Sequence, residues 1–411
     1  MELSPWGINR LQMEARRVAG WATTALGFTL PIWVSADGVL VALLVVCWVA
    51  SGEWRERIRR ITANPVAVSA ILLFGWLLAG SLWGMGSLEE RVLAVKKYAD
   101  LLLIPLLISM AVGIHERNRA LLALTASLVV TLLLSLALSV GFLPGSQALN
   151  CDRFNPCVFK KHTTHNVLMA FGALLFAVLA WKSSQRWVRW GLGGAAVLAA
   201  GNVLLMVQGR TGYVVLAGLA VMAFHMYFGW RGMLAAIVGL CLAFSAAYQV
   251  SSSFHQRVEL VVSGTTQWNP QVAAADPVGW RLEFFYHTAE IIRDHPLIGV
   301  GTGGFVQAYR SRAVQPGMAV PPHPHNQYLF IMAQVGIVGL GLLLWLFVQQ
   351  WRSAPLAGDA AYGLLARGLV VTIAVGCFFN PFLVDHTEKL FYCWFSGLMY
   401  SGTDPQLDTK T

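Results

Sequence analysis

Long apolar runs alternate with short polar segments from one end of the chain to the other. A helix needs about 20 mostly apolar residues to cross a hydrocarbon core about 30 Å thick, and most of the runs approach that length. The pattern predicts an all-α polytopic membrane protein with about twelve transmembrane helices, at residues 18–34, 37–50, 65–84, 92–113, 119–142, 164–181, 187–207, 211–228, 231–250, 326–349, 361–380 and 389–402.

The basic residues between the predicted spans indicate how the chain is oriented. Lys and Arg accumulate in the short cytoplasmic loops of membrane proteins. The short basic loops all fall on one side if the N-terminus is cytoplasmic, namely 51–62, 114–118, 182–189, 229–231 and 350–360. We therefore expect both termini in the cytoplasm.

The longest segment without a span of its own is 251–325, and it falls on the opposite face. Connections of this length are usually functional. Apolar residues at helical spacing predict a helix from Trp280 to Asp294, ending before Pro296. The sequence shows no internal repeat. We therefore expect a single membrane domain, 1–411, in which 251–325 is a partly helical periplasmic loop that caps the domain between the ninth and tenth spans.

The composition agrees with a membrane protein. Of the 411 residues, 56% are hydrophobic and 12% are charged, whereas soluble domains carry about 25% charged residues. The net charge of +9 would in other proteins point to nucleic acid. Here the basic residues lie in short loops between spans, so topology explains most of them. We expect membrane lipid around the chain and no nucleic-acid partner.

Two of the six cysteines differ from the others. Cys151 and Cys157 flank a short polar loop on the face opposite the basic loops, and in an oxidising compartment they should form a disulfide. Free thiols or metal ligands are the alternatives, although two cysteines alone make a poor metal site. The other four lie in apolar spans, where we expect small buried side chains.

Basic and histidine side chains gather on the face that carries the long loop. Taken singly, each has an ordinary explanation: an arginine at the membrane interface, a solvated lysine or a hydrogen-bonded histidine. Together they suit a lipid-linked phosphate or diphosphate, because Arg offers bidentate donors to phosphate oxygens and a neutral His is a plausible general base. The set comprises Lys160, Lys161, His162, His165, Arg210, Arg281, Arg293, His323 and His325.

Other motifs in these segments point to weaker alternatives. Residues 299–304 read G-x-G-x-x-G, but no strand precedes them, so a turn of close backbone approach is favoured over a nucleotide site. His162 with His165, or His323 with His325, could bind zinc, yet no carboxylate or cysteine stands at ligand spacing. The chain has no Asp-x-Asp, which argues against a metal- and nucleotide-sugar-dependent glycosyltransferase.

Three stretches of the second half resemble the O-antigen ligase and polymerase superfamily of bacterial envelope glycosyltransferases. They are Gly209-Arg-Thr-Gly212, then Arg281-Leu-Glu-Phe-Phe with Asp294-His-Pro-Leu-Ile-Gly-Val-Gly-Thr-Gly-Gly-Phe305, and His325-Asn-Gln-Tyr-Leu with Gln334-Val-Gly-Ile-Val-Gly-Leu340. The stretches cover about 130 residues, in an order and spacing that are fairly specific. The first half of the chain is similar only in its pattern of spans.

The resemblance is strongest to O-antigen ligases, which transfer O-polysaccharide from undecaprenyl diphosphate to lipid A–core. It implies a periplasm-facing site in the bacterial inner membrane, with no cofactor or metal. It also implies that Arg210 and Arg281 bind the diphosphate, and that His325 activates the acceptor hydroxyl for inverting attack. We further expect five residues to contact substrate, Lys160, Lys161, His162, His323 and Asn326. The tandem His323-Pro-His325 departs from the family pattern, and His325 is preferred as the base because Asn326 follows it.

Three other functions fit the same features. O-antigen polymerases share the layout of helices, the arginines and the long loop. Protein O-oligosaccharyltransferases share the His-Asn region, often with an additional C-terminal region, and only about nine residues follow the last predicted span here. A secondary anion transporter would also have about twelve spans, but such carriers usually show paired repeats, and the charges here gather at one face.

Overall fold

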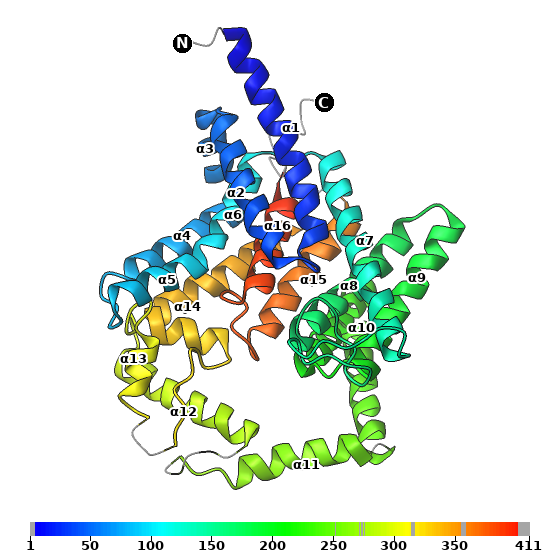
Figure 1. Ribbon diagram of the computed structural model, residues 1–411, viewed down its shortest axis with the longest axis vertical. Helices are drawn as coiled ribbons and strands as arrows, with labels where there is room; N and C mark the ends of the chain where they lie inside the picture. The colour runs from blue at the N-terminus through cyan, green and yellow to red at the C-terminus, as the bar shows by residue number, and fades with distance from the viewer. Residues whose placement is uncertain are drawn as a thin grey trace.

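The computed structural model describes residues 5–250, 252–270, 272, 274, 276–313, 317–354 and 359–401, and this part of the chain is helical with only two isolated β-bridges (Figure 1). In chain order the elements are α1 Pro5–Thr29, α2 Val34–Ala50, α3 Trp54–Ala63, α4 Pro65–Gly80, α5 Leu88–Tyr98, η1 Ala99–Leu102, α6 Leu103–Ser109, α7 Ile114–Ser139, α8 His162–Lys182, α9 Arg186–Gly201, η2 Asn202–Met206, α10 Arg210–Val250, α11 Ser252–Thr266, α12 Pro277–Asp294, α13 Phe305–Arg310, α14 Gln327–Ser353, α15 Ala360–Gly376 and α16 His386–Tyr400.

The helices follow the predicted apolar runs, and several of them are long enough to cross a membrane. Within the described residues, five helices meet that requirement by length and composition, and a sixth span results if the bent pair α2 and α3 counts as one. The predicted spans 211–228 and 231–250 both lie in α10, which kinks at Gly229 with φ 64°. The protein is thus an all-helical membrane protein, while the number of twelve spans stays a prediction.

The predicted fourth span, 92–113, is not one continuous helix. The chain forms α5, a turn of 3-10 helix and then α6. At this break the Nζ of Lys389 lies 3.0 Å from Asp100 Oδ2 and donates to the backbone carbonyl of Lys97, also at 3.0 Å. A side chain from α16 therefore binds a carboxylate and a backbone carbonyl at the point where the helix is broken.

The basic loop 51–62 is also more ordered than topology alone requires. Residues 54–63 form α3, and Arg57 is buried rather than solvated. Its guanidinium donates to Trp48 O and Ser51 Oγ and stacks near the rings of Trp48 and Trp54, at 5.3 and 5.6 Å from their centroids. At least one of the basic residues assigned to topology thus holds α2 against α3.

The centre of the bundle is α16, which is surrounded by α6, α8, α14 and α15 (Figure 1). Fourteen consecutive residues of this helix, 387–400, are buried. Phe171 of α8 packs edge-on against Phe391 and Phe395 of α16, with ring centroids 5.1 and 5.0 Å apart. The last predicted span is therefore the core of the protein rather than a lipid-facing helix.

The start of α1 lies at one end of the molecule and α11 to α13 lie at the other (Figure 1). The predicted helix 280–294 is confirmed as the main part of α12, which begins earlier because Asp276 caps it by accepting from Val278 N and Gly279 N. Two further helices, α11 and α13, fall in the segment 251–325 that the sequence left without a span.

The glycine-rich segment 299–304 fills a break in α14. Helix α14 leaves helical geometry at Val335 and Gly336, whose φ is 67°. Val300 N and Gly301 N then donate to the carbonyls of Ala333 and Gln334 at 2.9 and 2.7 Å. A Cβ at Gly301 would collide with the backbone of Gly84 in the turn after α4. The prediction of close backbone approach is thus confirmed, and the glycines serve the packing of three segments.

Candidate functional site

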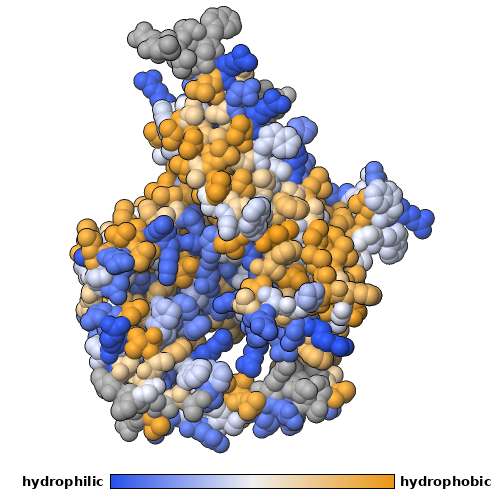
Figure 2. Space-filling model, in the orientation of Figure 1, coloured by the Kyte–Doolittle hydropathy of each residue, from blue (hydrophilic) through white to orange (hydrophobic). Residues whose placement is uncertain are grey.

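Three segments far apart in the sequence meet at the end of the molecule that carries α11 to α13. Arg210 begins α10, Arg281 lies in the first half of α12, and His325 precedes α14. The three groups lie within electrostatic range of one another. The positive charge of Arg281 lowers the pKa of His325, and that of Arg210 lowers the pKa of Arg281. Hydrophilic residues surround a hollow at this end of the molecule (Figure 2). We refer to Arg210, Arg281 and His325 as the arginine site.

His325 is held in an unusual geometry. Its φ is 55°, a left-handed conformation that few non-glycine residues adopt and that often marks functional positions. The imidazole stacks on the ring of Phe284 from α12, with a centroid distance of 6.1 Å and an interplanar angle of 17°. Burial and the Arg281 guanidinium lower the pKa of His325, whereas a hydrogen bond with the Asn380 side chain raises it. The ring is therefore neutral at pH 7.

The tautomer of His325 follows from its partners. Asn380 Nδ2 donates to Thr211 Oγ1 at 3.0 Å, which leaves the amide oxygen to face the histidine. The Nδ1 atom is buried without a hydrogen-bond partner. We infer that Nε2 carries the proton and that Nδ1 has the lone pair that a general base requires.

The two arginines are the cationic part of the site. Both side chains are exposed, and among the described residues neither forms an ion pair with a carboxylate. Partial burial and the neighbouring Arg210 lower the pKa of Arg281. Two guanidinium groups held together without a carboxylate repel each other, so an anion placed between them would be bound favourably.

The packing of the protein explains why glycines stand on either side of Arg210. A Cβ at Gly209 would lie 2.6 Å from Asn166 Nδ2, and one at Gly212 would also collide with Asn166. Asn166, on α8, donates to the carbonyls of Val207 and Gly209 at 3.0 Å each. The space beside these glycines is thus occupied by the Asn166 side chain, which fixes the start of α10, where Arg210 lies.

His323 and Asn326 lie on either side of His325, and both have contacts within the protein. His323 Nδ1 accepts from the backbone N of His325 at 3.3 Å. Asn326 caps α14, since its Oδ1 accepts from Leu329 N and its Nδ2 donates to Phe378 O. These bonds hold the turn that carries His325. Substrate contact by either residue stays a prediction.

Lys160 does not point into open solvent. Its side chain is 5% exposed, and its Nζ has no hydrogen-bond partner. The carboxylates of Asp37 and Glu388 interact with it electrostatically. Burial lowers the pKa of Lys160, and the two carboxylates oppose this effect. Together with the Lys389–Asp100 pair, these residues form an inner charge cluster, consisting of Asp37, Asp100, Lys160, Glu388 and Lys389. Lys160 is therefore placed to balance internal charge, and its contact with substrate is untested.

The neighbours of Lys160 lie nearer the surface. Lys161 is exposed, and its charge acts on the carboxyl of Asp385. His162 begins α8 and is half-buried, with no partner for Nδ1. Their expected contact with substrate also stays a prediction.

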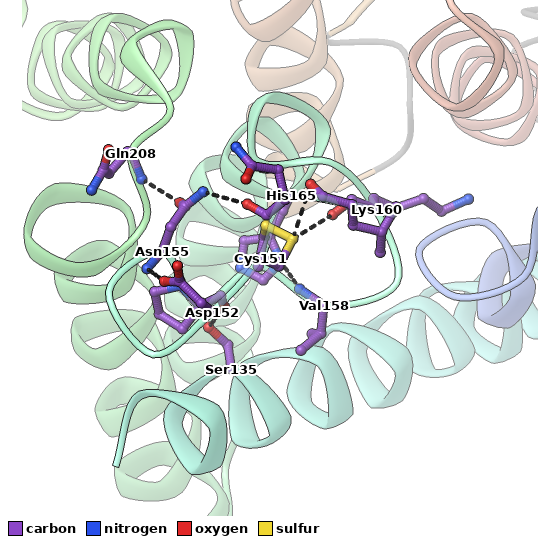
Figure 3. The surroundings of a disulfide bond; sticks show 12 residues. Ser135, Cys151, Asp152, Asn155, Val158, Lys160, His165 and Gln208 are labelled. Atoms are coloured by element: carbon purple, nitrogen blue, oxygen red, sulfur yellow. Dashed lines mark hydrogen bonds between the residues drawn. A yellow bond between two sulfur atoms is a disulfide. The ribbon is translucent and has the colours of Figure 1, made fainter. Parts of the chain in front are cut away.

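The predicted disulfide between Cys151 and Cys157 is present (Figure 3). It closes the short loop 151–157, at whose start Cys151 exchanges backbone hydrogen bonds with the preceding Ser146. Within this loop Asn155 Oδ1 accepts from Gln208 N at 3.0 Å. The Lys160 side chain points away from the disulfide in Figure 3. The loop thus links the segment before α8 to the one that leads into Arg210.

The neighbouring His165 has a structural role. Its Nε2 lies 3.0 Å from Asn202 Oδ1, and its Nδ1 accepts from Val158 N. Because both ring nitrogens of His165 already have partners, neither is free to bind zinc together with His162. Among the described residues no three His, Cys, Asp or Glu side chains gather in a way that could hold a metal ion.

Sequence reasoning missed Asn380 and Asp385. Both lie between α15 and α16, where the sequence predicted the end of the span 361–380 at Asn380 and no functional residue after it. Asn380 connects Thr211 to His325. Burial, with the nearby Glu388 carboxylate, raises the pKa of Asp385 to about 7, although Lys97, Lys389 and Lys161 oppose the shift.

The chain has been compared with known proteins. None of the curated proteins matches it. A solved chain from a peptidoglycan synthase complex, described for its structural coordination of polymerization and crosslinking, has 19% identity and a TM-score of 0.47, with 80% of this chain and 94% of that chain covered. Residues 194–344 match the family model described as O-antigen ligase, and this range includes the arginine site. The resemblance of the three sequence stretches is thereby confirmed: residues 194–344 are similar to the O-antigen ligase family.

Proposed function

We propose that this protein is an O-antigen ligase of the bacterial inner membrane. In this proposal it transfers O-antigen polysaccharide from undecaprenyl diphosphate to lipid A–core, with inversion at the anomeric carbon, without a metal ion and on the periplasmic side. The observation that carries the proposal is the convergence of Arg210, Arg281 and His325 from three separate segments of the family-matched region.

The arginines suit the leaving group of this reaction. When the bond between the sugar and the lipid diphosphate breaks, negative charge accumulates on the departing phosphate oxygen. Planar guanidinium groups donate paired hydrogen bonds to phosphate oxygens, and preorganised charge of this kind commonly contributes about 10²–10³-fold to a rate. Arg210 and Arg281, which lack carboxylate partners among the described residues, are free to do so.

His325 suits the acceptor side. The acceptor hydroxyl attacks the anomeric carbon, the new glycosidic bond forms as the bond to the diphosphate breaks, and the hydroxyl proton passes to Nδ1 of His325. The amide oxygen of Asn380 accepts a hydrogen bond from Nε2–H and holds the ring, as the orienting group of a catalytic histidine does. Direct displacement inverts the anomeric centre, and the proton later leaves to solvent.

The break in α14 does not favour the transporter alternative. Broken helices in transporters expose backbone groups that bind the transported ion. Here the carbonyls of Ala333 and Gln334 at the break accept from Val300 N and Gly301 N, and Ile337 N donates to Pro296 O. The segment between α12 and α13 thus satisfies these groups within the protein.

A complementation experiment in a deletion strain tests the proposed function. The wild-type chain should restore O-antigen attached to lipid A–core, and Arg210→Ala and His325→Ala should not, at equal levels in the membrane. Arg293→Ala is the matched control, because Arg293 lies on the same helix as Arg281 but is exposed and paired with Asp294 at 3.4 Å.

The glycans of the deletion strain decide between the two related activities. Long chains that stay on the lipid carrier indicate a missing ligase, whereas single repeats indicate a missing polymerase and would refute the ligase proposal. Full activity of Arg210→Ala and His325→Ala would refute the proposed site.

A further inference from the structure

The turn His323-Pro-His325 separates two chemically different spaces. His325 lies beside Arg281, whereas His323 lies on the wall of a second cavity of about 190 Å³, bounded by α5, α13 and α14. The two imidazoles are 4.5 Å apart between centroids, at 77° to each other. A ligand in this cavity would therefore lie close to His325 but next to the other histidine of the turn.

The cavity presents donors for an anionic oxygen beside one carboxylate, that of Glu90, whose Oε2 already accepts from Ser87 N at 2.7 Å. Lys97 lines it and carries an exposed ammonium group. Burial, together with the charges of His325 and Lys97, lowers the pKa of His323 to about 4, so the ring is neutral at pH 7. Because Nδ1 of His323 accepts a hydrogen bond from His325 N, the single ring proton is on Nε2.

The remaining walls suit the apolar face of a sugar. Phe305 and Phe330 pack edge to face with their ring centroids 5.2 Å apart, and the ring centroid of His323 lies 6.3 Å from that of Phe330. Gln334, also in the lining, is already held, since its Nε2 donates to Tyr98 OH at 3.0 Å and its Oε1 accepts from Gly303 N at 3.2 Å. The volume is smaller than the 300–1,000 Å³ that is typical of sites for larger ligands. The cavity can thus hold only a small part of a large glycolipid.

We propose that this cavity binds a phosphate-bearing sugar of the acceptor glycolipid, with Lys97 and the Nε2–H of His323 binding the phosphate. The inference rests on the proposed function. In a direct displacement the incoming hydroxyl attacks from the face opposite the leaving diphosphate, and the base must touch that hydroxyl. With the diphosphate at Arg210 and Arg281, an acceptor bound beside His323 approaches His325 from the other side of the turn.

Equilibrium binding to the full-length protein in lipid nanodiscs tests the proposal. The probes are phosphorylated lipid A–core, the same molecule after removal of its phosphates, and undecaprenyl diphosphate. Lys97→Met should weaken binding of the phosphorylated acceptor by about tenfold or more, the loss expected for a charge-assisted hydrogen bond. Lys97→Arg should retain most of it. Lys96→Met is the matched control, since Lys96 is exposed on the same helix and does not line the cavity.

The dephosphorylated acceptor should bind equally to the wild type and to Lys97→Met, because the lysine then has no phosphate to bind. Three results would each overturn the proposal: wild-type affinity of Lys97→Met for the phosphorylated acceptor, an equal loss for the dephosphorylated one, or weaker binding of undecaprenyl diphosphate instead. A glycan-transfer assay on the same samples separates this site from the proposed function. Lys97-dependent acceptor binding without transfer by the wild type would refute the function and keep the site.

Discussion

Two groups of charged side chains in this protein differ in how their charge is balanced. The inner charge cluster holds acidic and basic groups together, with Lys389 3.0 Å from Asp100 and with Lys160 beside Asp37 and Glu388. The arginine site holds two exposed guanidinium groups that, among the described residues, have no carboxylate ion pair.

The difference suggests what each group is for. Charges that are buried and paired within the protein are costly to separate, so they hold segments together. Cations that are held together without a carboxylate have charge left for an external anion. By this comparison the inner charge cluster connects α2, the segment before α8 and α16, and the arginine site binds substrate.

The largest expected effect is the loss of activity without loss of stability at the arginine site. Arg210→Gln and Arg281→Gln should each lower kcat/KM for glycan transfer by about 10²–10³-fold, as the removal of a transition-state donor does. The double variant should lose less than the product of the two, because both act on the same diphosphate. Initial rates measure the loss of activity. An unchanged temperature of thermal unfolding shows that the substitutions leave the stability intact.

The inner charge cluster should behave in the opposite way. Lys389→Met leaves Asp100 without its partner, and we expect a loss of about 3 kcal/mol in the free energy of unfolding. The double variant Lys389→Met with Asp100→Asn should recover part of that loss, because no unpaired charge is left. Thermal unfolding in detergent measures both. Unchanged stability of the single variant would contradict the structural role assigned to the inner charge cluster.

The disulfide loop supports the inner charge cluster through Lys160, which follows Cys157 by three residues. Replacing both cysteines by Ser should lower the free energy of unfolding by about 2 kcal/mol, since the unfolded chain regains the freedom of a short loop. In the unreduced wild type, a thiol reagent added after denaturation should leave Cys151 and Cys157 unlabelled. Labelling of both residues would contradict the bond.

A smaller effect concerns the pH dependence of activity. Burial and Arg281 place the pKa of His325 below its ordinary value, so the base stays neutral, and transfer should persist, at pH values somewhat below about 6.5. Arg281→Gln removes a nearby positive charge and should move the acidic limb of the residual activity to higher pH. Arg281→Lys should not. Rates measured from pH 5 to 8 distinguish the two, and identical limbs would show that Arg281 does not act on His325.

The features that sequence could predict depend on local patterns. The helix 280–294 follows from apolar spacing that ends before Pro296, and the disulfide follows from two cysteines around a short polar loop. The arginine site was found because its residues lie within three recognisable stretches. The residues of the helix and of the disulfide loop are close together in the chain, and Arg210, Arg281 and His325 were each recognised within a stretch of their own.

The features that sequence missed depend on partners far away. The break after α5 involves Lys389, which contacts a carbonyl 292 positions earlier. Lys160 looks like a solvated or ligand-binding lysine until Asp37 and Glu388 are placed beside it. Asn380 gains its role only when Thr211 and His325 are brought to either side of its amide. Such pairings follow from the packing of helices, which a single sequence does not reveal.

The most direct test of the central claim is single-turnover transfer by purified His325→Ala, with undecaprenyl diphosphate-linked O-antigen and lipid A–core both present. The proposed mechanism predicts that both substrates bind with affinities close to those of the wild type, while transfer falls by about 10²–10⁴-fold, the range of a general base. Transfer by His325→Ala at the wild-type rate would show that His325 is not the base and that the arginine site does not perform this reaction as proposed.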